Sequence, residues 1–392
     1  MIDLMRTALR DPYRTAREAH PGLLAQRGFA AYDKDDPDLK AAHIARLCGI
    51  PASAFYRRAY ERWRRATCDP TRFAATVLKV ETRLFIGLSG SGMLETGCAL
   101  HHSYGTPYLP GSSIKGIVSR YVRETPFGQA NGAACDEVFG AAADPQGPHP
   151  DGLAGIYSFH DAWWVPGSAP TPLVAEVVTT HHPDYYGQNG ATPATDFDSP
   201  IPNGQIAVRG SFLITLEGPA GWLVLGLDML EQALIARGIG AKTRSGYGVM
   251  AKDEDEGRKL VAERAQAASQ AEALRQTQAA KAVQTAEQDR RAQLSPQARL
   301  VEDLDAKAEA YLAAAGLTRA QLFVEVKAAI NKLLEEGQTL EAAAERASLA
   351  DHLAASFDRI GWADPGGDRK KREKQEKKRR EQLDALRKGQ PA

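Results

Sequence analysis

The composition of one internal segment limits what this chain can fold into. From Glu254 to about Gln293 the sequence is dominated by Ala, Gln, Glu, Arg and Lys, with no Pro and with no Gly after Gly257. Such a segment is typical of a long helix, and its apolar stripe is mostly alanine, which makes it a weak coiled-coil candidate. We therefore predict a long helical linker at 253–295, with differently built regions on either side.

The residues after this linker are predicted to form a small helical bundle and a basic tail. Pro296 interrupts the long helix, and residues 296–364 carry apolar side chains at helical spacings, which indicates helices that pack together. Pro365 and two glycines then break the chain, and residues 365–392 are strongly basic. Such a run is usually a solvated or disordered arm, and it would attract RNA regardless of sequence.

Residues 73–252 have the composition of an α+β domain, because Gly, Pro and aromatic residues are frequent there and β-branched runs appear. The apolar patterns predict strands at 76–86, 155–160, 173–180, 205–216 and 247–250 and helices at 114–122 and 222–237. The order strand, helix, strands, helix, strand is a ferredoxin-like pattern, interrupted by an inserted loop at 181–204.

Residues 1–72 are predicted to be a helical, irregular region. Five arginines, at positions 57, 58, 62, 64 and 65, cluster there near Tyr56, Tyr60 and Trp63. One interpretation is a helix with a solvated basic face and an aromatic packing face. The other is a basic surface that contacts RNA or a neighbouring subunit.

The bulk composition excludes several classes of protein. The 392 residues carry 49 basic and 49 acidic side chains, which excludes a uniformly basic coat for nucleic acid but not a local basic patch. Cys48, Cys68, Cys98 and Cys135 are far apart in sequence, so neither a zinc knuckle nor a disulfide framework is expected. We expect no cofactor, no metal, no signal peptide and no membrane span, and hence a cytoplasmic protein.

The first candidate phosphate-binding motif is the segment Pro107–Gly116. A Pro-Gly pair forces a turn, and Ser112 or Ser113 is placed to cap the helix that follows. The unpaired N–H groups of a first helical turn favour an anion, and Lys115 would lie beside them. A phosphate is therefore a suitable ligand, although an ordinary capped helix with a surface lysine explains the same residues.

The second motif is the segment Gly238–Gly248, which has four glycines in eleven residues. Glycine lets the backbone approach a ligand closely and adopt positive φ, and residues 242–245 (Lys, Thr, Arg, Ser) supply side-chain donors. A Walker P-loop is not expected, because Ala241 precedes the lysine and the motif lies after a helix and before a strand. A loop along an RNA backbone fits the residues better.

The inserted loop is the third feature. It is long, polar and aromatic, which is typical of a loop that projects from a sheet. Its side chains could stack on bases or wedge between them; they are His181, His182, Tyr185, Tyr186 and Phe197. A metal site at the two histidines and Asp184 is disfavoured, because the side chains of neighbouring residues diverge on an extended chain.

A fourth feature, the segment from Glu95 to His101 and His102, allows two interpretations. A glutamate and two histidines at the end of a strand could perform general acid–base cleavage of RNA. Alternatively these side chains bond to the loop backbone and have a structural role, which we favour.

Taken together, several segments resemble the RAMP superfamily of CRISPR proteins. The resemblance rests on Leu94–Gly97, Tyr104-Gly105, Pro107–Gly116, Phe159–Ala162 and the glycine-rich stretch 238–248, which occur in the family's order. With the segment 181–186, the combination is most like the sixth RAMP subunit of the type III-B Cmr effector complex. The resemblance covers about residues 20–250.

The resemblance implies a ferredoxin-like, RRM-related RNA-binding fold, with the helical N-terminal region and a C-terminal α-helical extension outside it. It also implies a subunit that caps the backbone of the complex at the crRNA 3′ end, contacts crRNA, target RNA and other RAMP subunits, and does not cut RNA. Backbone subunits cut with an aspartate in the loop after the first strand, and Gly87–Gly92 has none. The region after residue 253 departs from the compact family pattern.

Three hypotheses remain open from the sequence: a guide-holding subunit, a metal-independent endoribonuclease that processes crRNA through His101, His102 or His181, and a structural adaptor. In the first, phosphate contacts fix register without reading sequence. Backbone N–H groups near residues 112, 113, 240 and 246 would contribute as well. Its predicted RNA-binding residues are Ser112, Ser113, Lys115, His181, His182, Tyr185, Tyr186, Gly240, Lys242, Thr243, Arg244, Ser245 and Tyr247.

Overall fold

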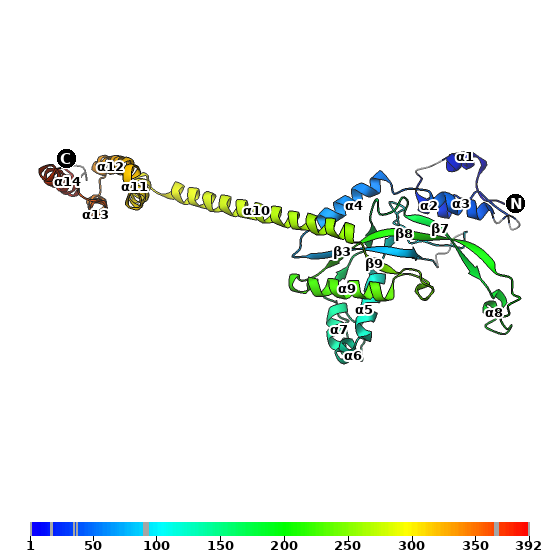
Figure 1. Cartoon of the computed structure of the whole chain (residues 1–392). Helices are drawn as coiled ribbons and strands as arrows, with labels where there is room; N and C mark the ends of the chain where they lie inside the picture. Colours follow the sequence, from blue (N-terminus) through cyan, green and yellow to red (C-terminus); the bar gives the residue numbers. More distant parts are fainter. Residues whose placement is uncertain are drawn as a thin grey trace. The chain divides into compact units, whose positions relative to one another are not determined.

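The computed structural model describes residues 2–15, 19–33, 36, 38–88, 94–363 and 368–390. The chain divides into two compact units, Met1–Ala273 and Leu274–Ala392, which we call the N-terminal unit and the C-terminal unit (Figure 1). The long helix α10 (Glu254–Gln293) begins in the first unit and ends in the second.

The N-terminal unit is built on a seven-stranded antiparallel sheet. Its strands are β3 (Phe73–Leu84), β4 (Tyr108–Leu109), β5 (Ser158–Phe159), β6 (Ala162–Trp164), β7 (Leu173–Thr180), β8 (Ile201–Glu217) and β9 (Met250–Lys252). They follow the order β4-β6-β8-β3-β9, and β5 and β7 also pair with β8. With its many helices, the unit has the α+β class that the sequence predicts.

Strand β8 is longer than predicted and changes partner along its length. Residues 201–208 pair with β7 from Thr180 back to Leu173, and residues 210–217 pair with β3 from Val80 back to Phe73. At Gly210, where the second of these pairings begins, φ is +99° and a Cβ would lie 2.5 Å from Trp164 Nε1, so a side chain is excluded there. The predicted loop 181–204 was wrong at its end, because β7 draws residues 201–204 into the strand.

Helices cover both faces of this sheet. Phe212, Leu213 and Ile214 are at most 1% exposed, and three consecutive buried residues on a strand require cover on both faces, because successive side chains point in opposite directions. Figure 1 shows α9 (Leu223–Arg237) and α5 (Gly111–Glu124) on one side of the sheet and α4 (Ala54–Ala66) on the other.

The remaining elements of this unit are short. They are β1 (Ile2–Asp3), α1 (Thr7–Thr15), α2 (Pro21–Arg27), β2 (Ala31–Tyr32), α3 (Asp38–Cys48), α6 (Pro126–Ala130), α7 (Gly132–Phe139), α8 (Pro183–Gly187) and the 3-10 turns η1 (Ala220–Trp222) and η2 (Thr243–Ser245). The first 72 residues are thus mainly helical, as predicted. The predicted strand 155–160 is only β5, and β6 was missed, because both strands are too short to show an apolar alternation.

The glycine-rich loop after α9 packs on the end of β3. The N–H of Ala241 donates to Phe85 O at 2.8 Å, and the N–H of Gly248 donates to Arg83 O at 2.7 Å. A Cβ on Gly240 would lie 2.1 Å from Phe85 O, and one on Gly248 would lie 1.9 Å from Ile239 O. These two glycines are therefore required by backbone packing within the chain.

The C-terminal unit contains the end of α10 and four further helices: α11 (Pro296–Ala313), α12 (Gly316–Gln338), α13 (Ala343–Ile360) and α14 (Arg369–Lys388). Helix α14 adds Leu383 and Leu386, each 2% exposed, to a core that includes Val326, Leu353 and Phe357. The expectation of a solvated or disordered arm is therefore wrong for α14, because its two leucines are buried. Residues 364–367, where Pro365 and the two glycines lie, are outside the described residues.

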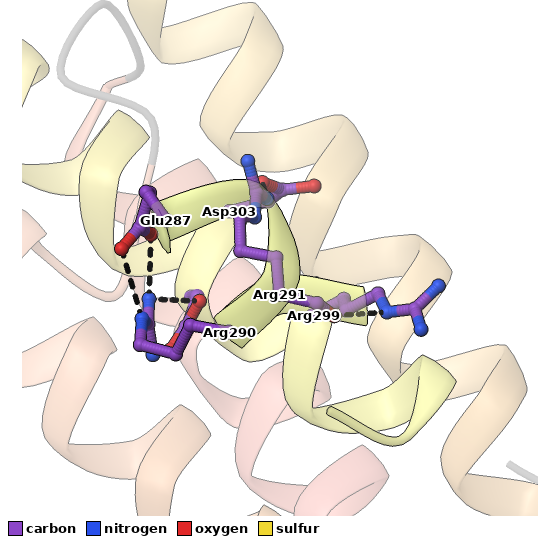
Figure 2. A network of polar contacts seen from close by, with 6 residues as sticks. Glu287, Arg290, Arg291, Arg299 and Asp303 are labelled. Carbon is purple, nitrogen blue, oxygen red and sulfur yellow. Dashed lines mark hydrogen bonds and ion pairs between the residues drawn. The ribbon is translucent and has the colours of Figure 1, made fainter. Parts of the chain in front are cut away.

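A network of ion pairs and backbone contacts fastens the end of α10 to α11 (Figure 2). The guanidinium of Arg290 contacts Glu287 at 2.7 Å and Glu302 at 2.6 Å, and Arg291 contacts Asp303. Arg299 donates to the carbonyl oxygens of residues 291 and 292 at 2.7 and 2.6 Å, which satisfies two acceptors that a helix end leaves unpaired. The chain therefore makes a defined turn between the two helices.

The packing of α14 can be tested by shortening one leucine. Leu386→Ala should destabilise the C-terminal unit by about 2–5 kcal/mol, because it leaves a cavity in a closed core. Hydrogen exchange of the α13 peptides in the full chain measures this effect. Lys378→Ala, an exposed change on the same helix, should alter stability by less than about 0.5 kcal/mol, and equal exchange in both variants would contradict the packing.

Two glycines of the loop provide a matched pair for testing its backbone. Gly240 and Gly246 have φ of +95° and +86°, so alanine should cost about 1–2 kcal/mol at either position. Only at Gly240 does the added Cβ meet backbone, whereas at Gly246 nothing lies within 4 Å. Gly240→Ala should therefore destabilise the unit by a further ~1–3 kcal/mol in urea unfolding, and equal costs would disprove the close approach.

Candidate nucleic-acid interface

The start of α5 is built differently from the sequence prediction. Pro110 is the N-cap residue and makes no side-chain cap, while the N–H of Gly111 donates to Asp161 Oδ1 at 2.8 Å. The proposed capping by Ser112 or Ser113 is therefore wrong, and the N–H of Ser113 itself donates to Pro110 O at 2.9 Å. Part of the hydrogen-bonding capacity expected for a phosphate is thus already used within the chain.

The three polar residues predicted on α5 lie in two grooves. Ser112 and Lys115 line a groove of about 700 Å³ with Arg120 and Arg123. Arg120 pairs with Glu124 at 2.8 Å and Arg123 with Asp136 at 2.8 Å. Lys115 has no carboxylate partner among the described residues, so it is the cation of this groove whose charge is not locally balanced.

Ser113 faces the glycine-rich loop instead. A second groove, of about 560 Å³, is lined by Ser113, Ile117, Gly87, Gly240 and four apolar residues. The structure therefore brings the two predicted phosphate-binding motifs together, although they are more than a hundred residues apart in sequence. Thr243 and Arg244 line an adjacent groove of about 330 Å³ with Arg120 and Arg237.

The tip of the loop presents unpaired cations. Lys242 adopts a positive φ of 59°, and η2 follows it directly. The side chains of Lys242, Arg244 and Ser245 are exposed. Within the described part of the chain, neither Lys242 nor Arg244 has a carboxylate within 4.0 Å. Two free positive charges at a fixed turn make this tip suited to an anionic ligand.

Other groups of the loop are already used inside it. The N–H of Gly246 donates to Thr243 O at 3.1 Å, so the expectation that this N–H contacts a phosphate is not supported by the geometry. The ring of Tyr247 packs on Phe85 with centroids 4.5 Å apart, and its partial burial raises the pKa of Tyr247. Tyr247 therefore stabilises the loop by packing against Phe85.

Sequence reasoning missed two arginines beside this loop. Glu124 accepts from Arg120 at 2.8 Å and from Arg237 at 2.7 Å, and these contacts hold the pKa of the Glu124 carboxyl below its usual value. The i,i+4 spacing of Arg120 and Glu124 on α5 was a readable signal. No local pattern predicts the contact with Arg237, because that residue lies on another helix.

The aromatic loop lies at the end of an arm formed by β7 and β8, and Figure 1 shows α8 at its tip, away from α5 and α9. The backbone N–H of Thr195 donates to Asp198 Oδ2 at 3.1 Å, and His182 Nδ1 lies 2.7 Å from the same oxygen; these contacts hold the pKa of the Asp198 carboxyl below its usual value. The contact between His182 and Asp198 thus stabilises the conformation of the loop. The exposed aromatic side chains are Tyr185 at 41%, Tyr186 at 68% and Phe197 at 97%, and His181 is exposed as well.

Of the histidines in the alternative catalytic hypothesis, His181 lies apart from His101 and His102. His101 packs beside Tyr104, with centroids 4.5 Å apart, and beside Trp163 at 5.6 Å, and burial lowers the pKa of His101. His102 is exposed, and His181 lies at the tip of the β7–β8 arm. Among the described residues, no group of three or more His, Cys, Asp and Glu side chains is arranged to hold a metal ion.

No helix in the described part of the chain is long and apolar enough to cross a membrane. The loop from Gly87 to Gly92, whose sequence lacks an aspartate, lies mostly outside the described residues, which omit 89–93.

Comparison with known proteins identifies the sheet domain. Residues 77–251 match the RAMP superfamily. The Cmr6 subunit of the CRISPR Cmr system of Pyrococcus furiosus is 25% identical over 251 residues, which span 49% of this chain and 73% of that subunit.

Two solved structures are similar to the chain. One is from the cryo-EM structure of the type III-B Cmr-beta complex bound to cognate target RNA, with 17% identity, a TM-score of 0.44 and coverage of 57% of this chain and 76% of that one. The other is the crystal structure of Cmr6 from Pyrococcus furiosus, with 23% identity, a TM-score of 0.28 and coverage of 46% and 97%. The family match and the curated relative confirm the resemblance found in the sequence, which is carried by residues 77–251.

Proposed function

We propose that this chain is a crRNA-binding and assembly subunit of a type III-B CRISPR effector complex that serves antiviral defence. The observation that carries the proposal is the loop tip, where Lys242 and Arg244 are exposed without carboxylate partners among the described residues, next to grooves shared with α5. The similarity to Cmr6 supports the choice of complex. The partners would be crRNA, target RNA and other RAMP subunits.

We also propose that residues 73–252 form a ferredoxin-like, RRM-related domain. The strand order β9-β3-β8-β6, all antiparallel, supports this arrangement. So does the chain order, in which α5 lies between β3 and β6 and α9 lies between β8 and β9. In this scheme β4, β5 and β7 are additions to the basic pattern.

Binding in this proposal depends on the phosphates of the RNA. Arg244 can contact a phosphate through two parallel N–H groups, and Lys242 and Lys115 add point charges. The hydroxyl groups of Ser113, Thr243 and Ser245 would donate to phosphate oxygens as well. Contacts of this kind fix the register of a strand without reading its bases, which suits a subunit that must hold variable guides.

The β7–β8 arm has a different role in the proposal. Tyr185 and Tyr186 are exposed at its tip and would stack on bases or wedge between them, with His181 beside them. His182 would hold the loop in shape through its contact with Asp198. We further propose that the subunit caps the crRNA 3′ end. It would not cleave RNA, because the sequence Gly87–Gly92 lacks an aspartate.

Neutralising the loop tip tests the proposal. Lys242→Gln with Arg244→Gln should weaken binding of labelled repeat–spacer RNA, and the slope of log K against log salt should fall by about 1.4, or ~0.7 for each lost phosphate contact to a single strand. Titrations over a salt series in EDTA measure the slope.

The matched control removes two positive charges that already have partners. Arg258 pairs with Asp255 and Lys259 with Glu256, so changing both to Gln should leave the slope unchanged. If the loop variant keeps the wild-type slope of log K against log salt, the proposed site is disproved. Absence of RNA binding by the chain and by its assembled complex would favour the adaptor hypothesis.

The same titrations separate a guide-holding subunit from a nuclease. We expect repeat–spacer RNA to stay intact in the presence of EDTA, and His101→Ala and His181→Ala to change nothing in this respect. Cleavage at defined positions by the wild type, lost in either variant, would establish the processing endoribonuclease instead.

A further inference from the structure

Helix α4 carries a basic face that the proposed function does not use. Its arginines 57, 58, 62 and 65 are all exposed, and none has a carboxylate within 4.0 Å among the described residues. At about 100° per residue, these four positions fall within about 140° of the helix circumference. Glu61 lies on the same face, and Arg65 donates to its backbone carbonyl at 3.3 Å. The face therefore keeps a net positive charge.

The opposite face of α4 holds the helix in one orientation. Tyr56 is 2% exposed, and its hydroxyl donates to Trp164 O at 2.7 Å. Trp63 stacks on Trp163 with centroids 6.1 Å apart, and Arg64 pairs with Glu263 at 2.9 Å. The helix therefore has the aromatic packing face and the exposed basic face that both sequence interpretations require, and the packing keeps the arginines on the outer side.

A pocket of about 330 Å³ lies at the start of this helix, which is within the size range of small-ligand sites. Ser53, Arg57, His20, Ser103 and Tyr104 contribute its polar groups. The pocket thus offers a guanidinium and an aromatic ring.

An exposed aromatic side chain stands beside this pocket. Phe55 is 60% exposed, and its ring centroid lies 5.1 Å from that of Tyr104. Sites for single-stranded nucleic acid combine a positively charged path for the backbone with aromatic rings on which bases stack. The four arginines supply the first part, and Phe55 with Tyr104 supplies the second.

We propose that α4 and this pocket form a second RNA-binding surface, on which the phosphates of a single strand follow Arg58, Arg62 and Arg65 and one base lies against Phe55 and Tyr104. Arg57 would contact the phosphate next to that base. The inference rests on the proposed function, but it uses a separate element, since none of these residues belongs to α5, the glycine-rich loop or the β7–β8 arm.

The test changes three arginines of α4 in the full chain. Arg58→Gln, Arg62→Gln and Arg65→Gln together should lower the salt slope for labelled repeat–spacer RNA by about 2, from ~0.7 per lost phosphate contact. The control removes three charges from exposed positions of α10 through Arg258→Gln, Lys259→Gln and Arg275→Gln, and it should keep the wild-type slope. Circular dichroism of both triple variants checks that they fold.

A second measurement examines the aromatic part without changing any charge. Phe55→Ala should weaken binding about fivefold or more while the salt slope stays constant, because a stacking contact releases no counterion. In the wild-type protein, 4-thiouridine in the RNA should cross-link to peptides that contain Phe55 or Tyr104. Cross-links confined to the glycine-rich loop or the arm would overturn the inference.

The outcomes distinguish this inference from the proposed function. If the loop-tip variant loses salt slope and the α4 variant does not, the guide-holding function stands and the second surface is disproved. If the α4 variant binds RNA normally but no longer assembles with neighbouring subunits, the face binds protein and the inference is again wrong. If the wild type binds no RNA in any form, both fall together.

Discussion

The antiparallel pairing of β8 with its neighbours is the interaction on which the N-terminal unit depends. This one strand bonds to β3, β5, β6 and β7, and its apolar residues 212–214 are buried on both faces of the sheet. A strand that gains partners on both sides and cover on both faces cannot shift its register without exposing its core residues. The fixed register of β8 also sets the positions of α5, α9 and the β7–β8 arm. Each of these elements is connected to β8 or packs against the sheet that contains it.

The candidate interface follows from a second constraint, the close approach of the glycine-rich loop to the end of β3. Gly240 and Gly248 leave no room for a Cβ beside the backbone of Phe85 and Ile239. The loop is therefore fastened at its base, while its tip stays exposed with Lys242 and Arg244 unpaired among the described residues. If the loop binds phosphate as we propose, its rigid base leaves it little conformational freedom to lose on binding.

The distribution of charge reconciles the zero net charge of the chain with the RNA binding that we propose. Many cations of this chain are paired: Arg120 and Arg237 with Glu124, Arg123 with Asp136, and Arg290 with Glu287 and Glu302. In the described residues, the loop tip and the outer face of α4 are places where several cations lack such partners. Local imbalance of this kind, and not the total charge, sets the field that an RNA strand meets.

The helices with strong apolar periodicity, the long helix after residue 253 and the motifs that resemble the RAMP superfamily could be read from the sequence, because these signals are local in the chain. Other features became visible only in the fold: Asp161, fifty residues away, bonds to the start of α5, Ser113 and Gly240 share a groove, and α14 packs into a bundle. Contacts between distant segments depend on which surfaces are buried together, and no local pattern contains that information. The basic composition of α14 conceals two leucines that are buried in the bundle. The very short β5 and β6 form because they pair with the long strand β8, and β4 in turn pairs with β6.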